Sequence, residues 1–195
     1  MHNYFILESH PSPENCTINK CPEPLDSKKW RIAEGEPMGG HYSPPVRLDM
    51  DKSHGGMHIP DFIDNNLHLP LVSGKLKQLL ERESNAEIEF LPFMLYNHKG
   101  RVACDDCYIA NVLGSQDCVD RTRTEGQEDA SEPGQYIGLF RLFLDPARID
   151  PQSRLFRISA KPSVLIIRDD LRALFEQNEV TGARYIAMGE KCMLY

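Results

Sequence analysis

YIANVL at 108–113, DCVD at 117–120 and LDPARI at 144–149 are the phrases that set the framework of the second half of the chain. YIANVL is mostly apolar, which is typical of a strand. DCVD is expected to continue the sheet after a turn at Gly114. The Asp145-Pro146 pair ends the preceding strand, because proline cannot donate a hydrogen bond to a sheet ladder. These phrases therefore predict a well-specified core.

Two segments have the residue spacing of amphipathic helices. In residues 73–83, leucines recur at i, i+3 and i+4, and Ser73 can cap the first turn. In residues 169–178, a similar apolar stripe follows Asp169 and Asp170, whose negative charge is favourable at a helix N-terminus. We expect both segments to be helices.

Short apolar or alternating segments are expected to be strands, namely 4–7, 46–50, 88–91, 136–144, 164–167 and 184–188. Pro92 follows the third of these and predicts an edge position, a bulge or a break in that strand. Connections between consecutive strands are mostly short, which favours antiparallel pairing. The sequence therefore predicts an α+β fold, with a mostly antiparallel sheet and two main helices at about 73–83 and 169–178.

The chain has 195 residues, which is typical of one domain with a sizeable core. Many of its 14 prolines and 13 glycines lie before residue 75, so we expect the first third to be loop-rich. Residues 1–58 are expected to pack as a loop-rich segment on the body, and residues 59–190 to form the α+β domain. Residues 125–135 are acidic and contain Pro133-Gly134, which predicts an exposed hairpin connection.

The charge balance is acidic, with 22 Lys and Arg against 29 Asp and Glu and a formal net charge of −7. This argues against a nucleic-acid-binding protein, which normally has a clustered basic surface, and is compatible with a basic protein partner. No apolar run approaches the roughly 20 residues that span a membrane, and residues 1–8 lack the basic start of a signal peptide. We therefore expect a cytoplasmic protein without membrane contacts, whose six cysteines are reduced.

One group of residues suggests a metal site: Cys104 and Cys107, with His98 before them and Cys118 after them. Structural zinc sites usually pair two closely spaced knuckles, and this segment has one. The strand expected from Tyr108 onward also points alternate side chains apart. Free thiols are the simpler interpretation, so we expect no metal and keep this zinc site as an alternative.

Signatures of common enzyme classes are missing. No glycine-rich phosphate loop leads into a helix, and no Gly-x-Ser-x-Gly elbow is present. We therefore expect a protein that is not an enzyme, needs no cofactor and works by presenting a surface. The residues expected to bind a partner are one aromatic and a run of acidic side chains, namely Trp30, Asp120, Glu125, Glu128, Asp129 and Glu132. A solvated loop for the acidic run and a buried packing role for Trp30 are the simpler alternatives.

Read together, the phrases resemble the myxobacterial-type immunity protein family, predicted antitoxins of bacterial polymorphic toxin and contact-dependent secretion systems. The residues that carry the resemblance are Pro60-Asp61-Phe62, Val72-Ser73 with the leucines at 76, 79 and 80, Glu89-Phe90-Leu91-Pro92, Tyr108-x-x-Asn111-Val112-Leu113, Asp117-Cys118-x-Asp120, Leu144-Asp145-Pro146-x-x-Ile149, Leu155-Phe156-Arg157 and the segment 165–182. The resemblance extends from Pro60 to Met188 and does not include the cysteines at 104 and 107.

The resemblance implies an α+β protein that is made beside a cognate toxin, binds it and blocks it by occluding its active site. It implies no catalytic residue. Two alternatives remain open. One is a zinc-stabilised regulator or small metal-dependent enzyme that uses Cys104, Cys107 and Cys118, and the other is a generic ligand-binding or scaffold module. The sequence carries no signal for the oligomeric state or for the identity of the toxin.

Overall fold

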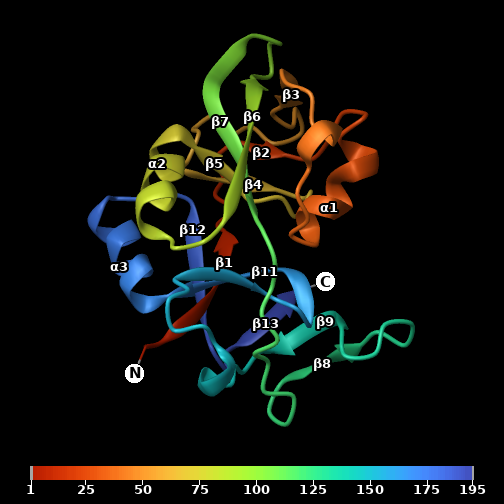
Figure 1. The fold of residues 1–195 in the computed structure, drawn as a ribbon. Coiled ribbons are helices and arrows are strands. Elements are labelled where there is room, and N and C mark those ends of the chain that lie inside the picture. Colours follow the sequence, from red (N-terminus) through yellow and green to blue (C-terminus); the bar gives the residue numbers. More distant parts are fainter. Residues whose placement is uncertain (1, 195) are drawn as a thin grey trace.

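The computed structural model describes residues 2–194, which form three sheets and three short helices (Figure 1). The strands are β1 (Tyr4–Ser9), β2 (Thr17–Ile18), β3 (Val46–Asp49), β4 (Phe62–Asn65), β5 (Leu71–Ser73), β6 (Ile88–Tyr96), β7 (Val102–Val112), β8 (Glu125–Glu128), β9 (Tyr136–Arg141), β10 (Leu155–Ile158), β11 (Lys161–Arg168), β12 (Ala183–Ala187) and β13 (Lys191–Leu194). The helices are α1 (Lys29–Ala33), α2 (Gly74–Glu83) and α3 (Asp169–Gln177). The expected α+β class, with sheet as the main component, is confirmed.

The largest sheet has the strand order β2-β4-β5-β7-β6-β3. Its pairs are antiparallel except for β2 with β4 and β3 with β6. α2 packs against β5 and β7, and the leucines at 76, 79 and 80 are buried there. The hydroxyl of Ser73 accepts a hydrogen bond from the Leu76 amide at 3.2 Å. The helix cap and the apolar spacing predicted from the sequence are therefore both confirmed.

The four-stranded sheet, β10-β11-β1-β12, contains the first strand of the chain in its interior. Ile6 in β1 lies opposite Ile166 of β11 on one side and Ile186 of β12 on the other. All three isoleucines are buried, and α3 packs against β11. The third sheet, β13-β9-β8, lies below this one in Figure 1. The N-terminal strand thus completes a sheet whose other strands all come from residues 155–187.

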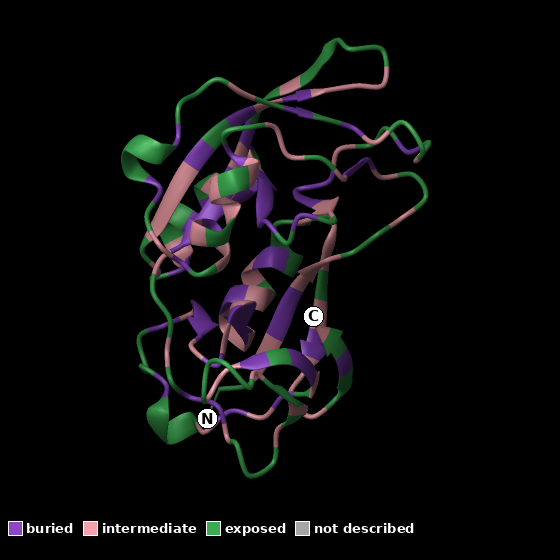
Figure 2. Cartoon of the chain, turned by 90° about the vertical axis from the view of Figure 1, so that its right-hand side faces the viewer, coloured by how far each residue is buried: buried purple, intermediate pink, exposed green. Residues whose placement is uncertain are grey.

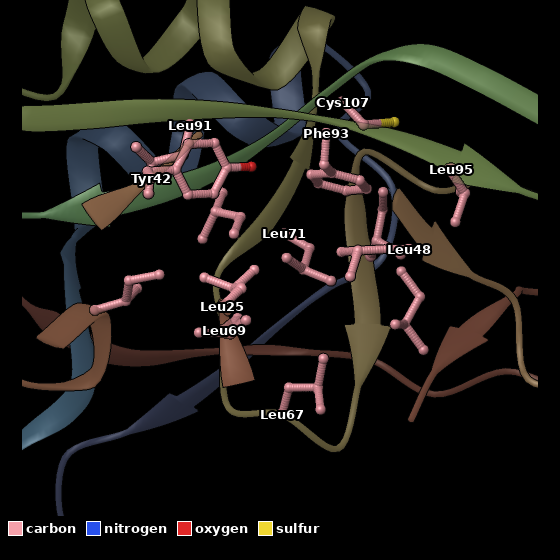
Figure 3. Packing of buried hydrophobic residues seen from close by; sticks show 14 of the residues in the cluster. Leu25, Tyr42, Leu48, Leu67, Leu69, Leu71, Leu91, Phe93, Leu95 and Cys107 are labelled. Carbon is pink, nitrogen blue, oxygen red and sulfur yellow. The ribbon is translucent and has the colours of Figure 1, made fainter. Parts of the chain in front are cut away.

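Apolar side chains bind the proline-rich first third to the rest of the molecule. In the largest buried cluster, Leu25, Tyr42 and Leu48 of this segment pack with Leu71 and Phe93 of the six-stranded sheet (Figure 3). Buried residues also run along the strands of the lower half (Figure 2). The segment is therefore irregular in backbone but closely packed.

The structure differs from the sequence-based expectation in its shorter elements. Three short helices stand where two main helices were expected, because α1 forms within the loop-rich segment. β8 occupies four residues of the expected loop 125–135, and DCVD contributes an isolated bridge from Val119 to Leu144 in place of a continued strand. Elements of two to five residues carry too few positions for a periodic pattern, so tertiary contacts decide them.

Pro92 lies inside a continuous strand and not at an edge of the sheet. β6 runs through it between β7 and β3, and pairing with β3 begins one residue later, at Phe93. The Pro92 carbonyl accepts a hydrogen bond of 2.7 Å from the Tyr42 hydroxyl. Because N and C=O of a strand residue face the same side, the proline nitrogen faces Tyr42 and no ladder bond with β7 is lost. The expected bulge occurs just beyond, between Phe93 and Leu95.

Asp61 joins the two halves of the molecule. Its carboxylate accepts hydrogen bonds from the Ser73 hydroxyl at 2.7 Å, and from the Thr181 amide and hydroxyl at 3.0 and 3.1 Å. Lys75 Nζ lies 3.1 Å from the same carboxylate. Burial alone would raise the pKa of Asp61, but these hydrogen bonds and the Lys75 charge outweigh it and hold the pKa below its ordinary value. Ionised Asp61 therefore ties the turn after α3 to the start of α2.

We predict that Asp61→Asn lowers the free energy of unfolding at pH 7 by about 2 kcal/mol, because donors arranged for a carboxylate lose their partner. A folded-state pKa below the unfolded value of about 3.9 gives stability that is present above that pH and is lost as the pH falls through the folded pKa. In urea unfolding, the difference in free energy of unfolding between wild type and variant should therefore be smaller near pH 3.5 than at pH 7. The control is Asp105→Asn at an exposed carboxylate, and an equal loss in both variants would contradict this role for Asp61.

Candidate partner-binding face

A buried arginine fixes the position of α1. Arg157 is 1% exposed, and its Nε donates to the Val112 carbonyl at 2.7 Å. Its Nη1 donates to the Pro162 carbonyl at 2.6 Å and to the Ala33 carbonyl at 3.4 Å. Burial lowers the pKa of this guanidinium to about 10, so it remains charged at neutral pH. One side chain thus joins the end of β7, the start of β11 and the last residue of α1.

Gly35 lets the chain pass close to Arg157. Its φ is +71°, and a Cβ placed there would lie 3.0 Å from both Arg157 Cδ and the Val112 carbonyl oxygen. The Gly35 carbonyl accepts a hydrogen bond of 3.0 Å from the Gly114 amide. Only glycine satisfies both the left-handed backbone and this close approach without strain. The exit from α1 is therefore tightly held against β7.

A second contact holds the segment that follows α1. The fully buried Asn111 of β7 donates from Nδ2 to the Glu36 carbonyl at 2.8 Å and to Glu89 at 3.2 Å. Glu89 in turn accepts hydrogen bonds from the amides of Met38 at 2.7 Å and Gly39 at 3.0 Å. These contacts fix the loop on the six-stranded sheet, so the outward side of α1 has a defined direction.

That outward side presents an aromatic and an acidic residue. Ile32 is fully buried, whereas the Trp30 side chain is 50% exposed and stacks with Arg31, whose Cζ lies 5.3 Å from the ring centroid. Glu34 is exposed one turn after Trp30, and its amide donates to the Trp30 carbonyl at 2.9 Å. Residues at i and i+4 share a helix face. Trp30 and Glu34 are therefore neighbours on the surface.

The acidic run forms the β8–β9 hairpin, which projects from the lower half of the molecule in Figure 1. Glu125 and Glu128 of β8 and Glu132 of the connecting loop are exposed. Glu125 is 3.7 Å from Arg141 of β9, and no ion pair involves Glu128 or Glu132 within residues 2–194. Asp129 accepts hydrogen bonds from the Ser131 amide and hydroxyl at 2.8 and 2.6 Å and so shapes the turn. The hairpin therefore carries carboxylates without cationic partners.

The end of α1 carries a carboxylate whose pKa responds to the charge of the hairpin loop. The pKa of Glu34 is raised by partial burial and then by the like charges of Glu132 and Glu36, while Arg157 and Lys161 act in the opposite direction. Glu34 and Glu132 thus repel each other, although they lie far apart in the sequence. We call the surface formed by Trp30, Glu34, Glu128, Asp129 and Glu132 the α1–hairpin face.

Two of the residues that the sequence predicted to bind a partner, Asp120 and Glu125, lie outside the α1–hairpin face. Asp120 sits in a turn, where its carboxylate accepts from the Thr122 amide and hydroxyl at 3.1 and 2.6 Å. Glu125 begins β8, at the far end of the strand from the loop. Sequence reasoning missed Glu34. Its i, i+4 spacing from Trp30 was the available signal, but it had meaning only once α1 was known to be helical.

The structure does not bring the four candidate metal ligands together. A bulge sets Leu95 opposite Cys104 and Phe93 opposite Cys107, so both thiols face the first buried cluster, whereas Cys118 belongs to the second. Burial, followed by a hydrogen bond with Cys104, strongly raises the pKa of Cys107 and disfavours the thiolate that zinc requires. Among residues 2–194, the side chains close enough to share an ion are His2, Asp169 and Asp170. Arg168 and Arg154 already bind Asp170, at 2.8 and 2.9 Å.

The sequence matches one protein-family model over most of its length. Residues 8–190 match the model of the immunity protein family Imm11. The chain belongs to the Imm11 family. The match confirms the resemblance to immunity proteins, and it extends into the N-terminal segment that the recognised phrases did not cover. No curated protein matches the sequence.

Membership of Imm11 supports an immunity role and favours a non-enzymatic one. The phrases that carried the resemblance contain the anchors Asp61, Glu89, Asn111 and Arg157, whereas all residues of the α1–hairpin face lie outside them. In residues 2–194 no helix is long and apolar enough to cross a membrane. The α1–hairpin face itself presents carboxylates and one exposed aromatic ring.

We predict that Gly35→Ala is more destabilising than Gly114→Ala. Both glycines have φ near +70°, but a Cβ at Gly114 meets no atom within 4 Å. Gly114→Ala thus measures the backbone cost alone, about 1 kcal/mol, and Gly35→Ala adds the close contacts with Arg157 Cδ and the Val112 carbonyl oxygen for a total of about 2–3 kcal/mol. Chemical denaturation of both variants provides the comparison, and equal losses would show that Arg157 does not restrict this position.

We also predict that Glu132→Gln lowers the pKa of Glu34, because it removes the repulsion between the two carboxylates. Carbon-detected NMR titration of the Glu34 carboxyl measures this directly. Glu87→Gln is the matched control, since Glu87 is exposed and lies outside the face. A Glu34 pKa that does not change in Glu132→Gln would mean that the hairpin tip and α1 do not approach each other in solution.

Proposed function

We propose that this Imm11 protein binds a cognate toxin through the α1–hairpin face and neutralises it by occluding its active site. The observations that support this most directly are the like-charge repulsion between Glu34 and Glu132 and the exposed Trp30 one turn before Glu34. Two carboxylates held near each other are unfavourable in the free protein, and a Lys or Arg side chain between them would convert repulsion into attraction. The rigid attachment of α1 through Arg157 and Asn111 means that the face does not need to reorganise before binding.

The composition of the face suits a protein partner with a basic surface. Exposed carboxylates along the hairpin would accelerate encounter and orient the toxin. Trp30 would supply the apolar anchor, because a half-exposed aromatic ring beside charged groups is a frequent source of binding energy. The six cysteines are free thiols, which is consistent with our proposal that the two proteins meet in the cytoplasm.

The test is co-expression with the toxin encoded by the neighbouring gene. Replacing Glu34, Glu128 and Glu132 together by Gln should lower the association rate about tenfold at low salt, reduce its salt dependence and weaken protection of the cell. Trp30→Ala in the same assay should speed dissociation. Surface plasmon resonance at several salt concentrations, alongside survival assays, provides both readouts.

The matched control neutralises three exposed carboxylates outside the face. Its substitutions are Glu14→Gln, Glu87→Gln and Asp105→Asn. This control has the same charge change as the triple variant, so it should keep wild-type kinetics if position matters and not net charge alone. Loss of protection to the same extent in both triple variants would contradict this location of the binding site. A toxin that kills whether or not wild-type protein is present would contradict the immunity function itself.

A further inference from the structure

β8 is the outer strand of the β13-β9-β8 sheet (Figure 1). Its inner side pairs with β9, and no backbone hydrogen bond joins its outer side to any other segment of residues 2–194. Three of its four residues, Glu125, Gln127 and Glu128, are exposed. An exposed strand edge of this kind offers backbone donors and acceptors to an incoming strand.

Two of the other sheet edges are covered by the chain. Residues around Gln116 cover β10, since the Gln116 amide donates to the Arg157 carbonyl at 2.8 Å and the Ser159 amide donates to the Gln116 carbonyl at 2.9 Å. The outer side of β2 is bonded by the Asp51 amide, at 2.9 Å from the Thr17 carbonyl. These two edges are closed by the chain itself, whereas the outer side of β8 is open and the strand carries the exposed carboxylates Glu125 and Glu128.

From this geometry we infer that the toxin adds a short basic strand to the free edge of β8. The inference rests on the proposed function, because it states how a toxin would use the hairpin. Residues 125–135 contain four acidic residues and no basic residue. A second copy of this chain would place Glu125 and Glu128 opposite like charges, which is unfavourable in a strand pair. A segment with alternating Lys or Arg would instead set opposite charges across the new ladder.

The backbone of β8 limits how long the added strand is. Gly126 presses against β9, because a Cβ there would lie 2.6 Å from both the Gly138 carbonyl oxygen and the Tyr136 ring. The pairing with β9 shifts register between Glu125 and Gly126 and again between Gln127 and Glu128. Such shifts bend a strand and interrupt its regular ladder. The addition therefore involves only the neighbourhood of residues 125–128.

The experiment uses the full-length protein, labelled with ¹⁵N, and a synthetic peptide of about ten residues that alternates Lys and Thr. The peptide should slow amide exchange of residues 125–128 by about tenfold and shift their resonances. A twin peptide with N-methyl groups on alternate residues keeps the charge but cannot form the ladder, so it should bind about tenfold more weakly. A second twin with Glu in place of Lys should not bind.

Replacing both Glu125 and Glu128 by Lys should reverse the preference, so that the Glu peptide binds better than the Lys peptide, whereas Glu87→Lys should leave it unchanged. Equal binding of the N-methylated peptide, protection at another edge, or no binding of the Lys peptide at all would each overturn strand addition. These outcomes are separable from the co-expression test. A protein that neutralises its toxin but gives no protection at β8 keeps its immunity function and loses this binding mode. Slower amide exchange at β8 in a protein that does not neutralise the toxin would instead support strand addition and contradict the immunity function.

Discussion

The buried guanidinium of Arg157 is the interaction on which the arrangement of this protein depends. Three carbonyl groups from three separate parts of the chain point at one side chain, and no carboxylate lies within ion-pair distance of it among residues 2–194. Removing a charge from water is expensive, and backbone carbonyls compensate for it only when the geometry is fixed. The cost of leaving this charge without hydrogen-bond partners therefore disfavours arrangements in which α1, the end of β7 or the start of β11 moves away.

This constraint explains why an irregular segment can present a defined surface. The first third of the chain has few regular backbone hydrogen bonds, yet Leu25 and Ile32 are buried and Glu89 and Asn111 hold the loop that follows α1. Within and just after α1, Ile32 and the Ala33 carbonyl thus face the interior, whereas Trp30 and Glu34 face outward. The anchors keep the face in place, while Trp30 and Glu34 are free to be chosen for a partner.

Local patterns allowed part of this structure to be predicted. α2 and β11 were predictable because a cap, a leucine stripe or a run of buried apolar residues is a property of neighbouring residues. The repulsion between Glu34 and Glu132 was not, because it depends on Arg157 meeting the carbonyl of Ala33 across the fold. The placement of Cys104 beside Cys107 was missed for a similar reason: one extra residue in β7 cancels the alternation that would have separated them. The acidic character of the hairpin was visible in the sequence, whereas its strand and its open edge were not.

The interior position of β1 also determines when during synthesis the protein can fold. A ribosome delivers Ile6 long before its two neighbours in the sheet, Ile166 and Ile186. Non-local strand pairing of this kind must wait for the distant segment and closes slowly. A nascent or prematurely terminated chain therefore lacks the four-stranded sheet, whose strand β11 contributes one of the three carbonyls that bind Arg157. Under the proposed function, only completely synthesised and folded protein would protect the cell. The cell would therefore need to contain this protein before it encounters the toxin.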